Sequence, residues 1–168
     1  MAVTVDIVAT YGGLGGPGRV MARMIAGPAR EDRALVILMV GCLVMFVAQM
    51  PRLSREAYLN GQDLNMLLGG ALLGWMFIAP LAFYGLAGLT QLAAHLTGGK
   101  GNGYGARLAL FWALLAASPL VLLHGLVAGF IGQGPGLQAV GAIWLAVFLW
   151  FWLAGFRQAQ RPMKEPAT

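Results

Sequence analysis

The chain has 168 residues, of which 59% are hydrophobic and only 10% are charged. Soluble domains carry about 25% charged residues, so this composition excludes a water-soluble domain and indicates a small membrane protein with one helical bundle. The net charge of +5 would suit nucleic acid, but the basic residues flank apolar runs. This placement favours anionic lipid headgroups as partners, and we expect no nucleic-acid partner.

Residues 1–33 are expected to form a cytosolic or interfacial segment. Pro17 opens a short amphipathic stretch, PGRVMARMIAG, with methionines and isoleucine on one side and arginines on another. The pattern predicts a helix in the headgroup plane with its apolar side in lipid; docking of a partner on the cytosolic face is the alternative. The residues expected to contact anionic lipid are Arg19, Arg23, Arg30 and Arg33.

Residues 34–157 contain apolar runs that predict four transmembrane helices. The first run begins at Ala34 and is expected to end at Pro51, because proline cannot readily extend the hydrogen-bond ladder of a helix. A polar connection of about 15 residues is expected to follow, as in longer interhelical loops.

The second run extends from about residue 64 to residue 96 and is longer than a bilayer requires. It contains Pro80, which predicts a kink, and the pair Gly70 and Gly74 at the spacing that lets transmembrane helices approach closely. We therefore expect a tilted or kinked helix that packs on its neighbours.

The third run, Arg107–Gly132, is a predicted span with Pro119 near its middle as a second kink. Small residues recur at intervals of four, interrupted by Val121, and predict a packing face on one side of the helix. The fourth run covers residues 137–156, and the tail 158–168 is basic and expected to be cytosolic. The small residues of the third run are Ala109, Ala113, Ala117, Gly125 and Gly129.

Ser118 and His124 are the polar residues expected inside the membrane. The serine hydroxyl is expected to bond to a carbonyl one turn back in the helix. An intramembrane histidine is a candidate for proton or substrate contact, but a neutral imidazole bonded to a carbonyl or water is the structural alternative. The spans contain no Asp or Glu and the chain has one cysteine, Cys42, so we expect no catalytic, metal or cofactor site.

The basic residues also predict an orientation. With four spans and a cytosolic N-terminus, nine of the eleven Lys and Arg residues fall on the cytosolic side. Because basic residues concentrate in cytosolic loops, we expect both termini inside and a location in a bacterial inner membrane.

Three stretches carry a family resemblance: GPAREDRALVILMVGCLVMFVAQMPRLSREA, YGARLALFWALLAASPLVLLHGLVAGFIG and WLAVFLWFWLAGFRQA. Together they resemble alphaproteobacterial members of the Yip-domain family, the Ypt/Rab-interacting proteins, over most of residues 27–157. The turn GGKGNGYGARLAL, followed by a span with Ser-Pro at its middle, is part of the likeness. Eukaryotic members of the family usually have five spans and bind prenylated small GTPases, whereas four spans are predicted here. The resemblance implies a non-enzymatic membrane protein.

Three functions are consistent with these features. The first is a membrane scaffold or adaptor that acts through helix packing, with a protein partner or a second copy of the chain. The second is an accessory subunit of a larger respiratory or photosynthetic complex. The third is a small transporter or lipid-moving protein that uses the proline kinks and His124.

Overall fold

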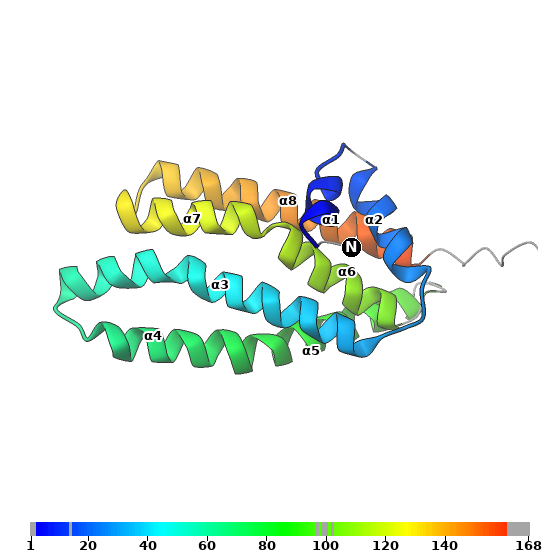
Figure 1. Ribbon diagram of the computed structural model, residues 1–168, viewed down its shortest axis with the longest axis horizontal. Helices are drawn as coiled ribbons and strands as arrows, with labels where there is room; N and C mark the ends of the chain where they lie inside the picture. The colour runs from blue at the N-terminus through cyan, green and yellow to red at the C-terminus, as the bar shows by residue number, and fades with distance from the viewer. Residues whose placement is uncertain (1–2, 14, 97, 99–100, 102, 161–168) are drawn as a thin grey trace, which may run out of the picture.

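The computed structural model describes residues 3–13, 15–96, 98, 101 and 103–160, and these residues form helices joined by short turns (Figure 1). The all-α class is therefore confirmed for the described part of the chain. The elements are α1 (Val3–Thr10), α2 (Gly16–Ile25), α3 (Glu31–Asn60), α4 (Leu64–Leu73), the π-helical turn η1 (Gly74–Ile78), α5 (Ala79–Leu96), α6 (Gly103–Ala116), α7 (Ser118–Phe130) and α8 (Pro135–Ala159).

Three helical segments of the described chain are each long and apolar enough to cross a membrane: α3, the continuous unit α4–η1–α5, and α8. Helices α6 and α7 meet the same criterion together, with a bend of 45° between them, so the structure has three or four candidate spans. The bend falls just before Pro119, where the sequence predicts a kink. These segments lie along the long axis of the molecule, with the turns at 61–63 and 131–134 at one end and α2 at the other (Figure 1).

The first span does not end at Pro51, and that prediction was wrong. Helix α3 continues to Asn60 with the proline inside it, and the expected 15-residue connection shrinks to residues 61–63. The lost N–H of one proline is offset by tertiary packing, since Pro51 lies against Gly129 of α7. The helix ends at Gly61, whose left-handed φ of 63° is the usual glycine C-cap geometry.

Arg55, on the extension of α3, binds the end of α7. Its Nη1 donates to the carbonyl oxygens of Gly129 at 3.2 Å and Phe130 at 3.3 Å, where the last carbonyls of a helix carry partial negative charge. The neighbouring Arg52 instead binds Gln49 and Glu56 of its own helix. Both basic residues at this end of the bundle therefore have partners inside the chain.

We expect Arg55→Met to lower the free energy of unfolding by about 1 kcal/mol, because it removes two charge-assisted bonds between α3 and α7. Arg52→Met is the matched control, since an exposed pair four residues apart on one helix contributes only about 0.3–0.5 kcal/mol. Thermal unfolding in detergent, followed by tryptophan fluorescence, measures both. Equal shifts for the two variants would contradict the docking role.

Helix α6 forms the centre of the bundle. Its residues from Leu108 to Ala116 are all at most 4% exposed, because α3, α5 and α8 surround it and α1 closes part of the remaining side. The sequence predicted one packing face on this segment, whereas the structure buries its whole circumference. The core of the protein thus lies at the end of the bundle where α1 and α2 are found (Figure 1).

The N-terminal helix α1 docks at the break between α6 and α7. Pro119 has no N–H, and the Leu120 N–H bonds to the Ala117 oxygen instead of continuing the regular pattern to Ala116. The Ala116 carbonyl accepts a hydrogen bond from the Tyr11 hydroxyl at 2.9 Å. One turn earlier, the buried Trp112 indole donates to the Thr10 hydroxyl at 3.1 Å. The last residue of α1 and the residue after it therefore supply polar partners where the candidate span α6–α7 is interrupted.

Helix α2 packs its apolar side on the protein and not on lipid. Val20, Met21 and Met24 are at most 5% exposed, and α2 lies along α8. The Met21 methyl group is 3.4 Å from the position that a Cβ would take at Gly155 of α8. This differs from the expected helix in the plane of the headgroups with its methionines in the bilayer. The apolar side of α2 packs instead on helices of its own chain.

Candidate functional site

The predicted packing glycines fall into two groups with different surroundings. Gly125 and Gly129 lie where α7 crosses α3: an added Cβ would be 1.9 Å from the Ala48 oxygen at Gly125 and 2.4 Å from the Pro51 Cβ at Gly129. These two glycines are therefore used for packing within the chain. The alanines of the same predicted stripe are buried to 1% exposure or less, at Ala109, Ala113 and Ala117.

Gly70 and Gly74 have no such neighbour. A Cβ at either position would meet no atom of the described chain within 4 Å, and the same holds for Gly69, Gly85 and Gly88. In the most apolar stretch of α4–η1–α5 no residue is buried. One side of α4–η1–α5 packs on α3 and α6, whereas no described residue covers these glycines.

Pro80 lies just after a π-helical turn. The Ala79 N–H bonds to the Gly74 oxygen five residues back, a wider turn than in an α-helix. A proline in a helix removes one bond and crowds the carbonyl four residues before it, and the π turn lies directly before this position. Such turns are frequent at functional sites, so η1, in the middle of α4–η1–α5, is a candidate position for one.

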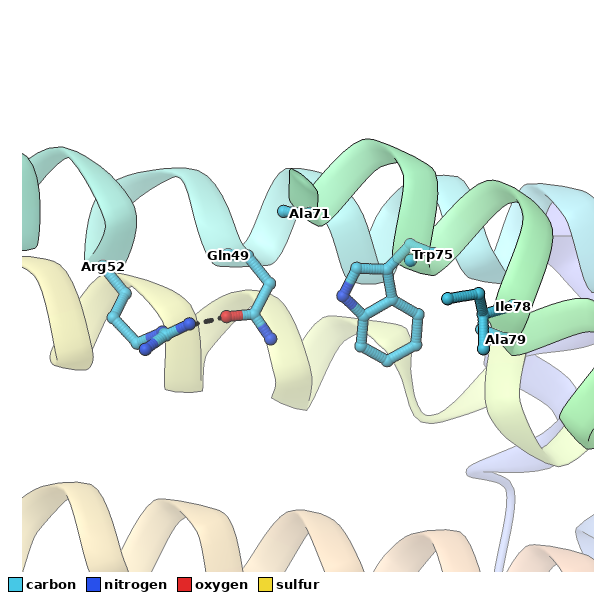
Figure 2. A pocket seen from close by; sticks show the side chains of 7 residues that line it. Gln49, Arg52, Ala71, Trp75, Ile78 and Ala79 are labelled. Atoms are coloured by element: carbon cyan, nitrogen blue, oxygen red, sulfur yellow. Dashed lines mark hydrogen bonds between the residues drawn. The ribbon is translucent and has the colours of Figure 1, made fainter. Parts of the chain in front are cut away.

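A groove of about 380 Å³ lies between α3 and the α4–η1 part of this helix. Figure 2 shows the Arg52 and Gln49 side chains of α3 and the indole of Trp75 from η1 along it. Arg52 Nε donates to Gln49 Oε1 at 3.0 Å and its Nη1 donates to Glu56 Oε2 at 3.2 Å. The other lining residues are Ala71, Gly74, Ile78 and Ala79.

The groove is lined by one paired arginine, one amide and otherwise apolar or small side chains. The positive charge of Arg52 is balanced by Glu56, while the opposite wall is apolar and shaped by small residues. Within the described residues, no three His, Cys, Asp or Glu side chains gather to hold a metal ion. A groove of this volume lies in the range of about 300–1,000 Å³ of known binding pockets, and its walls fit an apolar surface with a few hydrogen-bonding groups.

The two predicted intramembrane polar residues lie elsewhere. His124 is 3.2 Å from the Cβ position of Gly141 and so lies over α8. Ser118 is 9% exposed at the start of α7. Neither side chain makes a hydrogen bond with the described residues, so the expected bond from Ser118 to a carbonyl is not observed. Neither residue lines the groove between α3 and η1.

Three of the four arginines expected to contact lipid have partners within the chain. Arg19 donates to the Gly12 oxygen at 3.1 Å, and Arg23 pairs with Asp6 of α1 at 3.3 Å. Arg30 pairs with Asp32 at 2.7 Å. Arg33 makes no hydrogen bond or ion pair with any described residue. The arginines of α2 thus hold the N-terminal segment together as well as carrying charge.

Sequence reasoning did not single out Gln49 or Trp75. Gln49 had a visible signal, since it is an amide within an otherwise apolar run, and such residues are costly in lipid without a partner. Trp75 had none, because its position depends on the π turn. Comparisons with known proteins add nothing to these assignments: no family model, no curated protein and no solved structure matches the chain.

Proposed function

We propose that this protein is a non-enzymatic multi-pass membrane scaffold or adaptor that binds a partner helix at Gly70 and Gly74 of α4–η1–α5, beside the groove with α3. The observation that supports it is the difference between two glycine pairs of the same spacing. Gly125 and Gly129 are filled by α3, whereas Gly70 and Gly74 are open. Close approach at small residues drives helix association in lipid, and this surface is the one where that capacity is unused.

The Yip-domain type remains part of the proposal and is supported by the sequence resemblance described above. The same applies to placement in a bacterial inner membrane with both termini in the cytosol, which is supported by the distribution of basic residues. The partner is a second copy of the chain or another membrane protein. In the latter case the chain would be an accessory subunit of a larger complex.

The proposal is tested by photocrosslinking in the native membrane. A benzophenone amino acid replaces Leu73 of α4, which is 57% exposed, or as a control Leu149 of α8, which is 38% exposed. We expect a discrete adduct from position 73 and none from position 149. An adduct of twice the chain mass identifies a second copy, and another mass identifies a different subunit.

Gly74→Leu should abolish the adduct from position 73, because the leucine blocks the close approach of a partner backbone. Gly136→Leu is the matched control, since an added Cβ at Gly136 also meets no neighbour but lies at the start of α8. Adducts of equal yield at both probe positions, or an adduct that survives Gly74→Leu, would refute the proposed surface.

A further inference from the structure

A second groove, of about 610 Å³, lies between the C-terminal parts of α5 and α8. These two helix ends lie at the end of the bundle that also carries α2 (Figure 1). The groove is independent of the surface proposed above for a partner helix. The lining residues that matter here are Thr90, Trp152, Leu153, Phe156, Arg157 and Gln160.

Part of the polar lining of this groove is already satisfied. The Gln160 amide nitrogen donates to Gln91 Oε1 at 2.9 Å, and its oxygen accepts from the Gly101 N–H at 3.0 Å. The Thr90 hydroxyl donates to the Ala87 oxygen at 3.0 Å. These groups fix the ends of α5 and α8 and have little capacity left for a ligand.

One hydrogen-bond donor on the surface of the groove has no partner. The Arg157 side chain makes no hydrogen bond or ion pair with any described residue and is exposed. The Trp152 indole nitrogen also has no partner within the described chain, but it has no accessible surface from which to reach a ligand. An unpaired guanidinium on the groove calls for a ligand that accepts hydrogen bonds and carries negative charge.

The remaining wall is apolar. Leu153 is 48% exposed. Phe156 lies about one helical turn from Trp152, on the same side of α8. A ligand for this groove therefore combines an anionic group with an apolar chain. It must also lie near the membrane interface, because the groove is at the ends of two spanning helices and tryptophan favours that depth.

We propose that this groove binds one anionic phospholipid of the surrounding bilayer. The phosphodiester oxygens accept hydrogen bonds from Arg157, and an acyl chain lies along Leu153 and Phe156. Basic pockets between spanning helices bind lipid headgroups in this way. The C-terminal ends of α5 and α8 alone would repel an anion, so Arg157 decides the preference. This inference goes beyond the proposed scaffold function and does not depend on it.

The test is native mass spectrometry of the purified full-length chain with either dioleoylphosphatidylglycerol or dioleoylphosphatidylcholine. We expect the wild type to retain one phosphatidylglycerol and little phosphatidylcholine. Arg157→Gln should weaken phosphatidylglycerol binding about tenfold or more, because it removes charge-assisted bonds to phosphate.

Arg52→Gln is the matched control, since it removes the same charge from an arginine at the opposite end of the bundle, where Arg52 pairs with Glu56, and it should bind like the wild type. Arg157→Lys keeps the charge and should bind more tightly than Arg157→Gln, which separates lost binding from lost folding. Glycerol 3-phosphate at equal concentration should not compete, which distinguishes a lipid from a soluble phosphate. Equal retention of the two lipids, equal loss in Arg52→Gln and Arg157→Gln, or competition by glycerol 3-phosphate would each overturn the proposal.

Discussion

Gly125→Ala is expected to lower the free energy of unfolding by about 3 kcal/mol, a large effect for the addition of one methyl group. The Cβ of the alanine would be 1.9 Å from the Ala48 oxygen and 2.8 Å from its carbonyl carbon. These neighbours are backbone atoms of α3 that no rotamer change can move. Helices α3 and α7 would have to separate along their whole contact, and Arg55 would lose its position over the end of α7.

The matched control is Gly70→Ala, the same substitution in a glycine whose Cβ would meet no neighbour. Alanine is a better helix former than glycine, so this variant should gain about 0.5–1 kcal/mol. The melting temperature in detergent should therefore fall by about 6–12 °C for Gly125→Ala and rise by about 1–4 °C for Gly70→Ala. A small change of the same sign in both variants would show that α7 does not pack on α3 as closely as described.

This pair of glycines also shows what a spacing pattern can predict. Gly70 and Gly74 carry the same i, i+4 signature as Gly125 and Gly129. This spacing indicates that the backbone of another helix can approach the glycines closely. It does not indicate which helix does so. Only the fold places Ala48 and Pro51 against the second pair. Sequence reasoning could not distinguish the two pairs, because both have the same spacing.

The three prolines within apolar runs also show what the sequence can and cannot predict. At Pro119 the local cost decides the outcome: the helix breaks there with a bend of 45°, as the sequence predicted. At Pro51 a tertiary contact overrides the local cost and the helix continues for nine more residues. At Pro80 the backbone adopts a π turn just before the proline. A proline within an apolar run thus predicts an irregularity, but packing selects its form.

The N-terminal segment was the least predictable part of the described fold. Its amphipathic pattern predicts a helix with one apolar side. The pattern does not show whether that side packs on lipid or on protein. A lipid tail and the flank of α8 are equally apolar, so Val20 and Met21 are consistent with both. The contact that decides the matter is long-range, from Met21 of α2 to Gly155 of α8.

Met21→Ala distinguishes the two environments and is expected to be the second most damaging substitution. The side chain is 1% exposed and touches α8 at Gly155, so its removal leaves a cavity in a packed core and should cost about 2–5 kcal/mol. Met66→Ala is the matched control, because this methionine of α4 is 80% exposed and its loss should change stability by no more than about 0.5 kcal/mol. Thermal unfolding of both variants in detergent makes the comparison.

If α2 lay in the headgroup plane with its apolar side in lipid, both methionines would face the same kind of environment and the two variants would unfold at nearly the same temperature. A clear difference between them would mean that α2 is a structural part of the bundle.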